Sequence, residues 1–161
     1  MPASTYTELN LRSVLTLTAL VALCQLAGAS GAIVTDPGFY GDLARPSWAP
    51  PAWVFAPVWI TLYTLMGVAA WLVWRTGHGR RRALTWFGIQ LVLNAAWTPV
   101  FFGLRSIGGG LIVIVLLELA ILGTILAFAR RSRLAAVLMV PYAAWVGFAL
   151  ALNASLWSLN R

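Results

Sequence analysis

The spacing of charged residues limits the fold of this chain more than any other feature. Four long segments carry no Asp, Glu, Lys or Arg, namely residues 13–35, 46–74, 83–104 and 134–160, and a fifth, residues 106–129, carries only Glu118. A charge inside a bilayer is costly, and a helix needs about 20 apolar residues to cross it. The spacing therefore predicts an integral membrane protein and excludes a water-soluble monomer.

We expect an all-α bundle of five transmembrane helices that forms one domain over residues 1–161. The helices are predicted at about residues 12–33, 53–75, 84–104, 108–129 and 134–157. At 1.5 Å per residue, each is on the order of 30–35 Å long, enough to cross. Residues 34–52 contain acids, Arg45, prolines and glycines, which predicts a long structured loop outside the hydrocarbon.

The arginines predict the orientation of the helices. Among the 11 basic residues, the larger group would share one face of the membrane: Arg12, Arg75, Arg80, Arg81, Arg82, Arg130, Arg131 and Arg133. Arg45, Arg105 and Arg161 would share the other. Short loops rich in arginine stay cytoplasmic, so we expect the N-terminus inside and the C-terminus outside. The arginines at 80–82 are then a loop between two spans, and no nucleic-acid partner is expected.

The first apolar segment has a second interpretation. Arg12, the apolar run 14–26 and the tripeptide Ala27-Gly28-Ala29 are typical of a signal peptide with its cleavage site. However, the uncharged run continues through Val34, and the small residues 28–32 suit a close helix contact in lipid. We therefore expect a retained helix.

The 9 tryptophans fall into two groups by their expected depth. Tryptophan favours the headgroup level of a membrane. This accounts for five of them, Trp53 and Trp157 at the outer interface and Trp71, Trp74 and Trp86 at the inner one. It does not account for Trp48 in the loop, nor for the deeper Trp59, Trp97 and Trp145.

Polar and aromatic residues recur at helical spacing beside these deeper tryptophans. The faces are Gln90, Asn94 and Trp97 with Phe101; Tyr142, Trp145, Ala149 and Asn153; and Trp59 with Tyr63. Aromatic walls with a few amides suit a flat, apolar ligand, and Arg45 or Arg105 could meet its acidic edge. The same residues could instead join helices by hydrogen bonds. The stiff loop segment 46–57 would either cover such a cavity or only cap the bundle.

Other chemistry is sparse in this sequence. One cysteine, Cys24, cannot form an internal disulfide and is expected to pack inertly, and one histidine, His78, cannot build a zinc site alone. No acid–base pair or nucleophile constellation stands out, so we expect no catalytic residue, no metal and no required cofactor. A planar macrocycle would gain stacking from the tryptophan faces, but any haem bound there would lack an obvious protein axial ligand.

Three segments resemble one known family. They are residues 48–59 (WAPPAWVFAPVW), 90–103 (QLVLNAAWTPVFFG) and 141–145 (PYAAW). In this order they closely resemble the TspO/MBR family of tryptophan-rich sensory proteins, related to the mitochondrial translocator protein (peripheral-type benzodiazepine receptor). The resemblance runs from about Gly28 to Asn160, and it also favours a retained first helix.

The resemblance implies a five-helix bundle in membrane lipid, commonly a homodimer. It implies binding of protoporphyrin IX, haem-like tetrapyrroles, benzodiazepine- and isoquinoline-type drugs and, in some members, cholesterol. The ligand contacts it implies are Tyr40, Trp48, Trp59, Tyr63, Gln90, Asn94, Trp97, Trp145 and Ala149. We therefore expect a tetrapyrrole-binding sensor or receptor with a regulatory or stress-response role. The alternatives are a light- and oxygen-dependent porphyrin-degrading enzyme and a porphyrin or sterol transporter.

Two positions depart from the family pattern. Residues 156–161 lack the tyrosine of the cholesterol-recognition pattern attributed to some relatives, which argues against sterol binding. Glu118 stands near the middle of the fourth expected helix, where relatives carry an apolar or tryptophan side chain. An acid at this depth suggests a function, although a protonated glutamate bonded to a neighbour is the simpler explanation.

Overall fold

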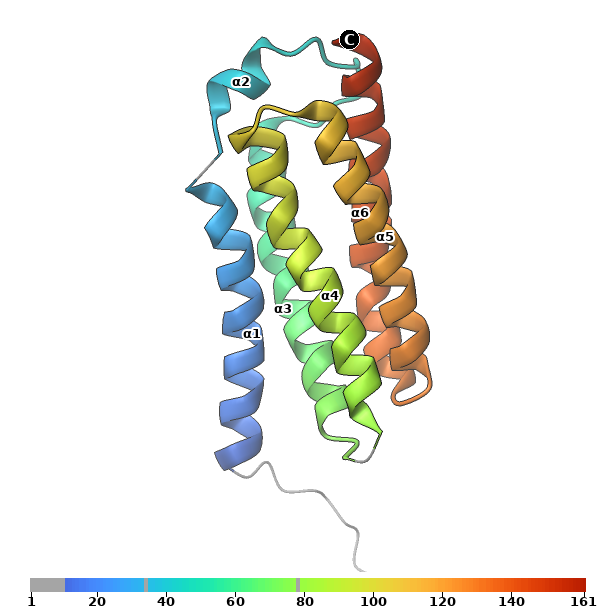
Figure 1. Ribbon diagram of the computed structural model, residues 1–161. Coiled ribbons are helices and arrows are strands. Elements are labelled where there is room, and N and C mark those ends of the chain that lie inside the picture. Colours follow the sequence, from blue (N-terminus) through green and yellow to red (C-terminus); the bar gives the residue numbers. More distant parts are fainter. Residues whose placement is uncertain (1–10, 34, 78) are drawn as a thin grey trace, which may run out of the picture.

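The computed structural model describes residues 11–33, 35–77 and 79–161, which form an all-helical bundle (Figure 1). Val34, the expected start of the outer loop, and His78 lie outside the described residues. The helices are α1 (Leu11–Ala32), α2 (Pro37–Asp42), α3 (Phe55–Trp74), α4 (Arg80–Thr98), α5 (Ile107–Ala129) and α6 (Arg133–Leu159). A 3-10 turn (Ala52–Val54) precedes α3, and a π-helical turn (Pro99–Gly103) follows α4.

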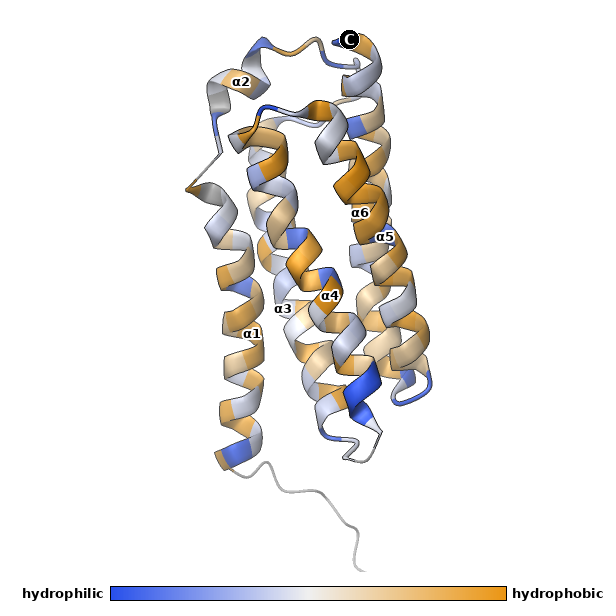
Figure 2. Cartoon of the chain, viewed as in Figure 1, coloured by the Kyte–Doolittle hydropathy of each residue, from blue (hydrophilic) through white to orange (hydrophobic). Residues whose placement is uncertain are grey.

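Within the described residues, four helices are long and apolar enough to cross a membrane, namely α1, α3, α5 and α6. Figure 2 shows hydrophobic residues along their length and hydrophilic residues mainly toward the two ends. Helix α4 does not meet the same criterion, because arginines open it and Gln90 and Asn94 lie within it. The expectation of five transmembrane helices is therefore confirmed for four by composition, and the short α2 adds a helix that was not expected.

The arginines at 80–82 do not lie in a loop as expected, but form the first turn of α4. Gly79 precedes them with φ of 76°, a left-handed conformation that glycine adopts without strain and that lets the chain reverse sharply. Arg80 then donates to the Trp74 carbonyl at 2.7 Å, across the turn. A helix can extend past the hydrocarbon because water solvates its charged first turn.

The bundle has two chemically different ends. The starts of α1, α4 and α6 and the ends of α3 and α5 meet at one end, which holds the larger arginine group and is called the arginine-rich end (Figure 1). Arg45, Arg105 and Arg161 lie at the opposite end, called the loop end. The structure thus separates the arginines into the two groups that alternating helices predict.

Small residues let α1 approach α3 and α4 closely. A Cβ on Gly28 would overlap the Tyr63 ring, and one on Gly31 would lie 2.8 Å from Thr98 Oγ1. Nearer the arginine-rich end, a Cβ on Gly67 would lie 2.6 Å from the Val21 Cα. The prediction that the small residues 28–32 of α1 serve a close helix contact is confirmed for Gly28 and Gly31.

Trp71 was expected in the membrane-interface belt, but the structure buries it between α1 and α3. Its Nε1 donates to the Ser13 carbonyl at 3.0 Å, and only 9% of the residue is exposed. Trp53, by contrast, is 75% exposed, in keeping with an interface position. A buried indole N–H needs an acceptor, and the carbonyl near the start of α1 supplies it.

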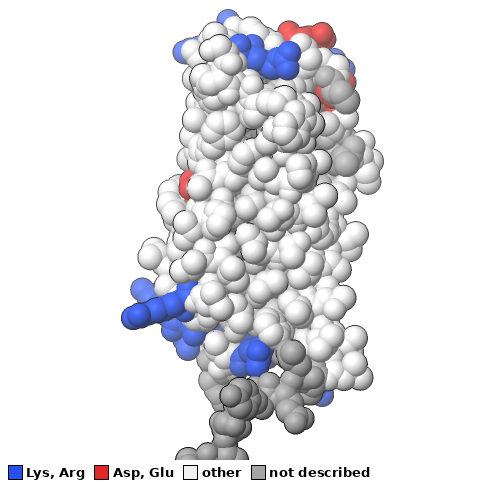
Figure 3. Space-filling model, turned by 180° about the vertical axis from the view of Figure 1, so that it is seen from behind, with Lys and Arg blue, Asp and Glu red and all other residues white. Residues whose placement is uncertain are grey.

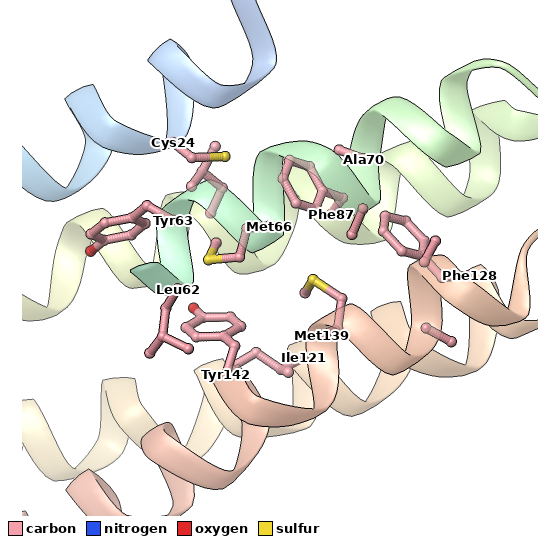
Figure 4. Close-up of a cluster of buried hydrophobic side chains, with 14 of the residues drawn as sticks. Cys24, Leu62, Tyr63, Met66, Ala70, Phe87, Ile121, Phe128, Met139 and Tyr142 are labelled. Carbon is pink, nitrogen blue, oxygen red and sulfur yellow. The ribbon is translucent and has the colours of Figure 1, made fainter. Parts of the chain in front are cut away.

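The half of the bundle nearer the arginine-rich end, here called the inner half, is densely packed. Figure 4 shows the cluster of buried hydrophobic side chains. Met66 of α3 and Met139 of α6 belong to it, and both are fully buried. Phe87 of α4 stacks on Phe128 of α5 with centroids 5.9 Å apart. Cys24 of α1 is also fully buried in the hydrophobic core, as expected for a packing residue.

Candidate functional site

A cavity of about 800 Å³ opens in the outer half of the bundle, the half nearer the loop end. Residues from α1, the outer loop, α3, α4, α5 and α6 all contribute to its lining. Helix α2 and the segment that follows it lie across this end of the bundle (Figure 1) and supply Tyr40, Gly41 and Arg45. The outer loop therefore covers part of the cavity.

The structure brings six of the nine expected ligand contacts to this lining: Tyr40, Trp59, Tyr63, Asn94, Trp97 and Ala149. The other three lie elsewhere. Trp145 packs on Phe55 and Phe148, with centroids 5.9 and 5.4 Å away, and Phe55 stands on the lining in its place. Trp48 packs edge-on against Phe148, and Gln90 is fully buried beneath the lining.

Stacked ring pairs form the aromatic side of the cavity. Trp59 stacks on Tyr63 with centroids 5.2 Å apart and an interplanar angle of 23°. Trp97 stacks on Phe101 at 4.9 Å and 20°, and its Nε1 donates to Asn153 Oδ1 at 3.2 Å. These contacts fix the ring orientations, so the aromatic surface is organised before any ligand arrives.

A chain of hydroxyl and amide groups closes the cavity on the side of the dense core. Tyr63 Oη donates to Asn94 Oδ1 at 2.8 Å, and Asn94 Nδ2 donates to Tyr142 Oη at 3.0 Å. Tyr142 Oη in turn donates to Gln90 Oε1 at 3.0 Å. This hydroxyl–amide chain joins α3, α4 and α6. The polar faces therefore do link helices, while Tyr63 and Asn94 also line the cavity.

The outer loop is held in place at both of its sides. Asp36 caps α2 through the amides of Gly38 and Phe39 and pairs with Arg105 at 2.8 Å. The amide hydrogen bond from Phe39 and the one from Arg105 lower the pKa of Asp36. On the far side, the Asn160 amide exchanges two hydrogen bonds with the backbone of Ala44, at 2.9 and 3.0 Å. Arg105, one of the two arginines considered for the acidic edge of a ligand, is thus paired with Asp36.

Tyr40 and Arg45 bring polarity to the loop side of the cavity. The Tyr40 hydroxyl is buried and has no hydrogen-bond partner among the described residues. The Arg45 guanidinium lies 5.5 Å from the Tyr40 ring centroid and is also part of the lining. Burial raises the pKa of the Tyr40 phenol, and the charge of Arg45 partly offsets this rise. The pair offers a hydroxyl and a cation to a polar ligand edge.

Several lining residues had no counterpart among the expected contacts. Gln25, Gly28 and Gly31 come from α1, whose small residues indicated helix packing but not a cavity. Phe102 comes from the π-helical turn, where Leu104 N donates to the Pro99 carbonyl at 2.9 Å. Proline has no N–H of its own to donate, and such a turn changes which side chains face inward. Pro99 was the one feature of the sequence that could have indicated this change of helix geometry.

Glu118 does not contribute to the cavity lining. Its Oε2 is buried without a hydrogen-bond partner in the described part of the chain, and its Oε1 lies 3.9 Å from where a Cβ on Gly147 would stand. The expected bond to a neighbour is therefore not found there for Oε2. Across the described ranges, no three His, Cys, Asp or Glu residues gather to hold a metal.

Comparison with known proteins places these features in a wider group. Residues 20–158 match the sequence model of the TspO/MBR family. The tryptophan-rich protein TspO of Chlorobaculum tepidum is 42% identical over 155 residues, covering 92% of this chain and 98% of the relative. The human translocator protein is 43% identical over 127 residues, covering 76% and 75%. Protein CrtK of Rhodobacter capsulatus is 41% identical over 140 residues, covering 85% and 88%.

Proposed function

The chain belongs to the TspO/MBR family, and from this premise we propose that it is a membrane-embedded tetrapyrrole receptor or sensor. Family membership and four apolar helices support an integral membrane protein with such a role. One relative, from Cereibacter sphaeroides, is named a tryptophan-rich sensory protein. Protoporphyrin IX is the proposed ligand, and benzodiazepine- and isoquinoline-type compounds are proposed to occupy the same cavity.

The observation that carries this proposal is the size and chemistry of the cavity. Its volume of about 800 Å³ lies in the range of small-molecule sites, and its lining is mostly apolar and aromatic. Trp59 and Trp97 offer ring faces on which a planar macrocycle can stack. A dense core or a hydrogen-bonded interface alone would leave no such space between the helices.

Polar groups at the loop side give the ligand an orientation. A tetrapyrrole with carboxylate side chains has one acidic edge and an otherwise apolar ring. We place that edge toward Arg45 and the Tyr40 hydroxyl, because burial leaves this hydroxyl without a partner among the described residues. The apolar ring then lies between the aromatic walls, above the hydroxyl–amide chain.

The same proposal includes a five-crossing topology, with α4 as the fifth crossing. Helix α4 lies beside α5 along its length (Figure 1), and its polar Gln90 and Asn94 are buried inside the bundle instead of facing lipid. With more arginines at one end, the N-terminus lies in the cytoplasm of a bacterial cell. Cysteines introduced at Gly77 and Ser158 should react with impermeant reagents from opposite sides of the membrane.

A titration of the purified protein with protoporphyrin IX, followed by the Soret absorption band, tests the ligand. Binding should saturate at one equivalent. Trp59→Ala and Trp97→Ala should each weaken it about fivefold, since stacking on one aromatic residue contributes about 1 kcal/mol. Trp53→Ala, at an exposed position outside the lining, is the matched control. Equal affinities for all four proteins would refute binding in this cavity.

The same preparation separates the receptor from the two alternatives. Protein-dependent decay of the Soret band under light and oxygen would show that the protein is a porphyrin-degrading enzyme and would contradict the receptor proposal. Net porphyrin uptake into liposomes that contain the protein would show that it is a transporter and would likewise contradict the receptor proposal. Stable saturable binding without either process is the result expected of a receptor.

A further inference from the structure

A second, smaller pocket lies at the arginine-rich end, between the start of α4 and the end of α5. Its volume is about 250 Å³, and its lining includes Gly79, Arg82, Trp86, Leu126, Arg130 and Arg131. It shares no lining residue with the outer cavity. What the outer cavity binds therefore has no bearing on the inference from this pocket.

The charges around this pocket are all of one sign in the described part of the chain. Asp36 and Asp42 belong to the outer loop at the opposite end, and Glu118 precedes Arg130 by about 18 Å along α5. The remaining acid, Glu8, lies outside the described residues. Figure 3 shows arginine side chains without acidic ones near the lower end, whereas the upper end carries both signs. The pocket is therefore suited to an anion from outside the chain.

One side of the pocket is apolar and leads onto the lipid-facing surface. The Trp86 ring crosses α5 at Gly123, where a Cβ would lie 2.9 Å from the ring atoms. Leu126 is 66% exposed and Ala127 completes this side. The pocket thus joins guanidinium groups to an apolar groove at the level where α5 ends and α4 begins, which is where the hydrocarbon of a bilayer would end.

We propose that this pocket binds the phosphate of an anionic phospholipid from the leaflet at the arginine-rich end. Arg82 and Arg130 are exposed at the pocket and donate to the phosphate oxygens, to which a guanidinium can present two parallel N–H groups. The glycerol and the first methylenes of an acyl chain lie along Trp86 and Leu126. A soluble phosphate would use the arginines but not this groove, so the apolar side favours a lipid. Basic pockets between transmembrane helices are a known means of selecting anionic headgroups.

Native mass spectrometry of the protein in detergent, titrated with phosphatidylglycerol and with phosphatidylcholine, tests the proposal. The double variant Arg82→Gln/Arg130→Gln should bind phosphatidylglycerol about 30-fold more weakly than the unmodified chain. The control variant Arg81→Gln/Arg133→Gln removes the same charge from the same end, but neither residue lines the pocket. It should bind phosphatidylglycerol within about threefold of the unmodified chain.

Three results would overturn the proposal. Equal losses in the pocket and control variants would mean that diffuse charge attracts the lipid. Equal affinities for phosphatidylcholine and phosphatidylglycerol would mean that the pocket does not recognise the net negative charge of the headgroup. Displacement of phosphatidylglycerol by millimolar inorganic phosphate, added alone, would assign the site to a soluble anion. Thermal unfolding followed by circular dichroism checks that both double variants stay folded, as is expected because all four arginines are exposed.

Discussion

The inner and outer halves of the bundle are built on the same helices but use aromatic residues in opposite ways. In the inner half, Phe87 and Phe128 fill the space between α4 and α5, and Met66 and Met139 leave no exposed surface. In the outer half, Trp59 and Trp97 stand in stacked pairs around open space. In the inner half, rings and flexible thioethers together fill the space between the helices, whereas in the outer half the rings line a space that the described side chains leave open.

The comparison predicts that the same truncation has a much larger effect on stability in the inner half. Phe128→Ala should lower the free energy of unfolding by about 3–5 kcal/mol, because the residue is fully buried and its removal leaves a void. Phe102→Ala, on the cavity lining, should cost less than half as much. Unfolding in sodium dodecyl sulfate, followed by circular dichroism, measures both. Equal losses would contradict the contrast between the two halves.

Glycine substitutions on the α1–α3 contact should separate stability from ligand binding. Gly67→Ala should destabilise the protein by about 1–3 kcal/mol, because the new methyl meets the Val21 backbone, which cannot rotate away. Gly28→Ala meets the Tyr63 ring, so it should shift that ring and reduce porphyrin affinity. Gly88→Ala is the control, since a Cβ there meets nothing within 4 Å, and it should stabilise α4 by up to about 1 kcal/mol. A Gly67→Ala protein as stable as the control would contradict the close approach.

The long helices were predictable from the sequence because composition alone decides which segments can cross a bilayer. The start of α4 was not, because a run of charges between two apolar segments is typical of a loop, while Arg80 and its neighbours form a solvated helical turn. The π-helical turn after Pro99 also escaped prediction, since its hydrogen bonds depend on how the next segment packs.

Cavity residues were predictable where their spacing along a helix was enough to show which side of the helix faces the cavity. Tyr142 and Trp145 lie about 60° apart around α6. That difference places Tyr142 in the hydroxyl–amide chain and Trp145 against Phe55 and Phe148. Spacing put both on one face, but the rotation of α6 in the bundle decides which of them is inside. That rotation depends on neighbouring helices, which a single sequence does not display.

The boundary between the two halves can be tested at its hydroxyl–amide chain. Tyr63→Phe removes the donor to Asn94 and should lower the free energy of unfolding by about 0.5–1.5 kcal/mol, the range for polar contacts within membranes. Tyr40→Phe removes a hydroxyl that has no partner among the described residues, so stability should stay within about 0.5 kcal/mol. The same detergent unfolding assay compares them. A larger loss of unfolding free energy for Tyr40→Phe than for Tyr63→Phe would contradict the assignment of Tyr63 as the hydrogen-bonded hydroxyl and Tyr40 as the unpartnered one.

The smallest effect is expected at the loop end, from the pH dependence of Asp36. Its pKa is lowered in the folded chain, so its contribution to loop stability is complete above the unfolded value of about 3.9 and is lost as the pH falls through the folded value. A nitroxide on Gly41→Cys, in a Cys24→Ala background, should gain mobility only as the pH falls below about 3.9. Asp36→Asn should be mobile above and below this pH, and Asp42→Asn should behave as the parent. A label insensitive to both pH and Asp36→Asn would contradict the role of the pair.

The three bonds of the hydroxyl–amide chain all point the same way, from Tyr63 through Asn94 and Tyr142 to Gln90. In this direction the Tyr63 oxygen has used its proton and presents a lone pair to the cavity. Turning each of the two amides over, so that its oxygen and nitrogen exchange places, and rotating the two hydroxyls reverses every bond, and Tyr63 then presents a proton. The reversed chain employs Gln90 Nε2, which lacks a partner among the described residues in the present direction. The cavity can therefore satisfy a ligand N–H or a ligand carbonyl at the same point, at the cost of one concerted reorientation.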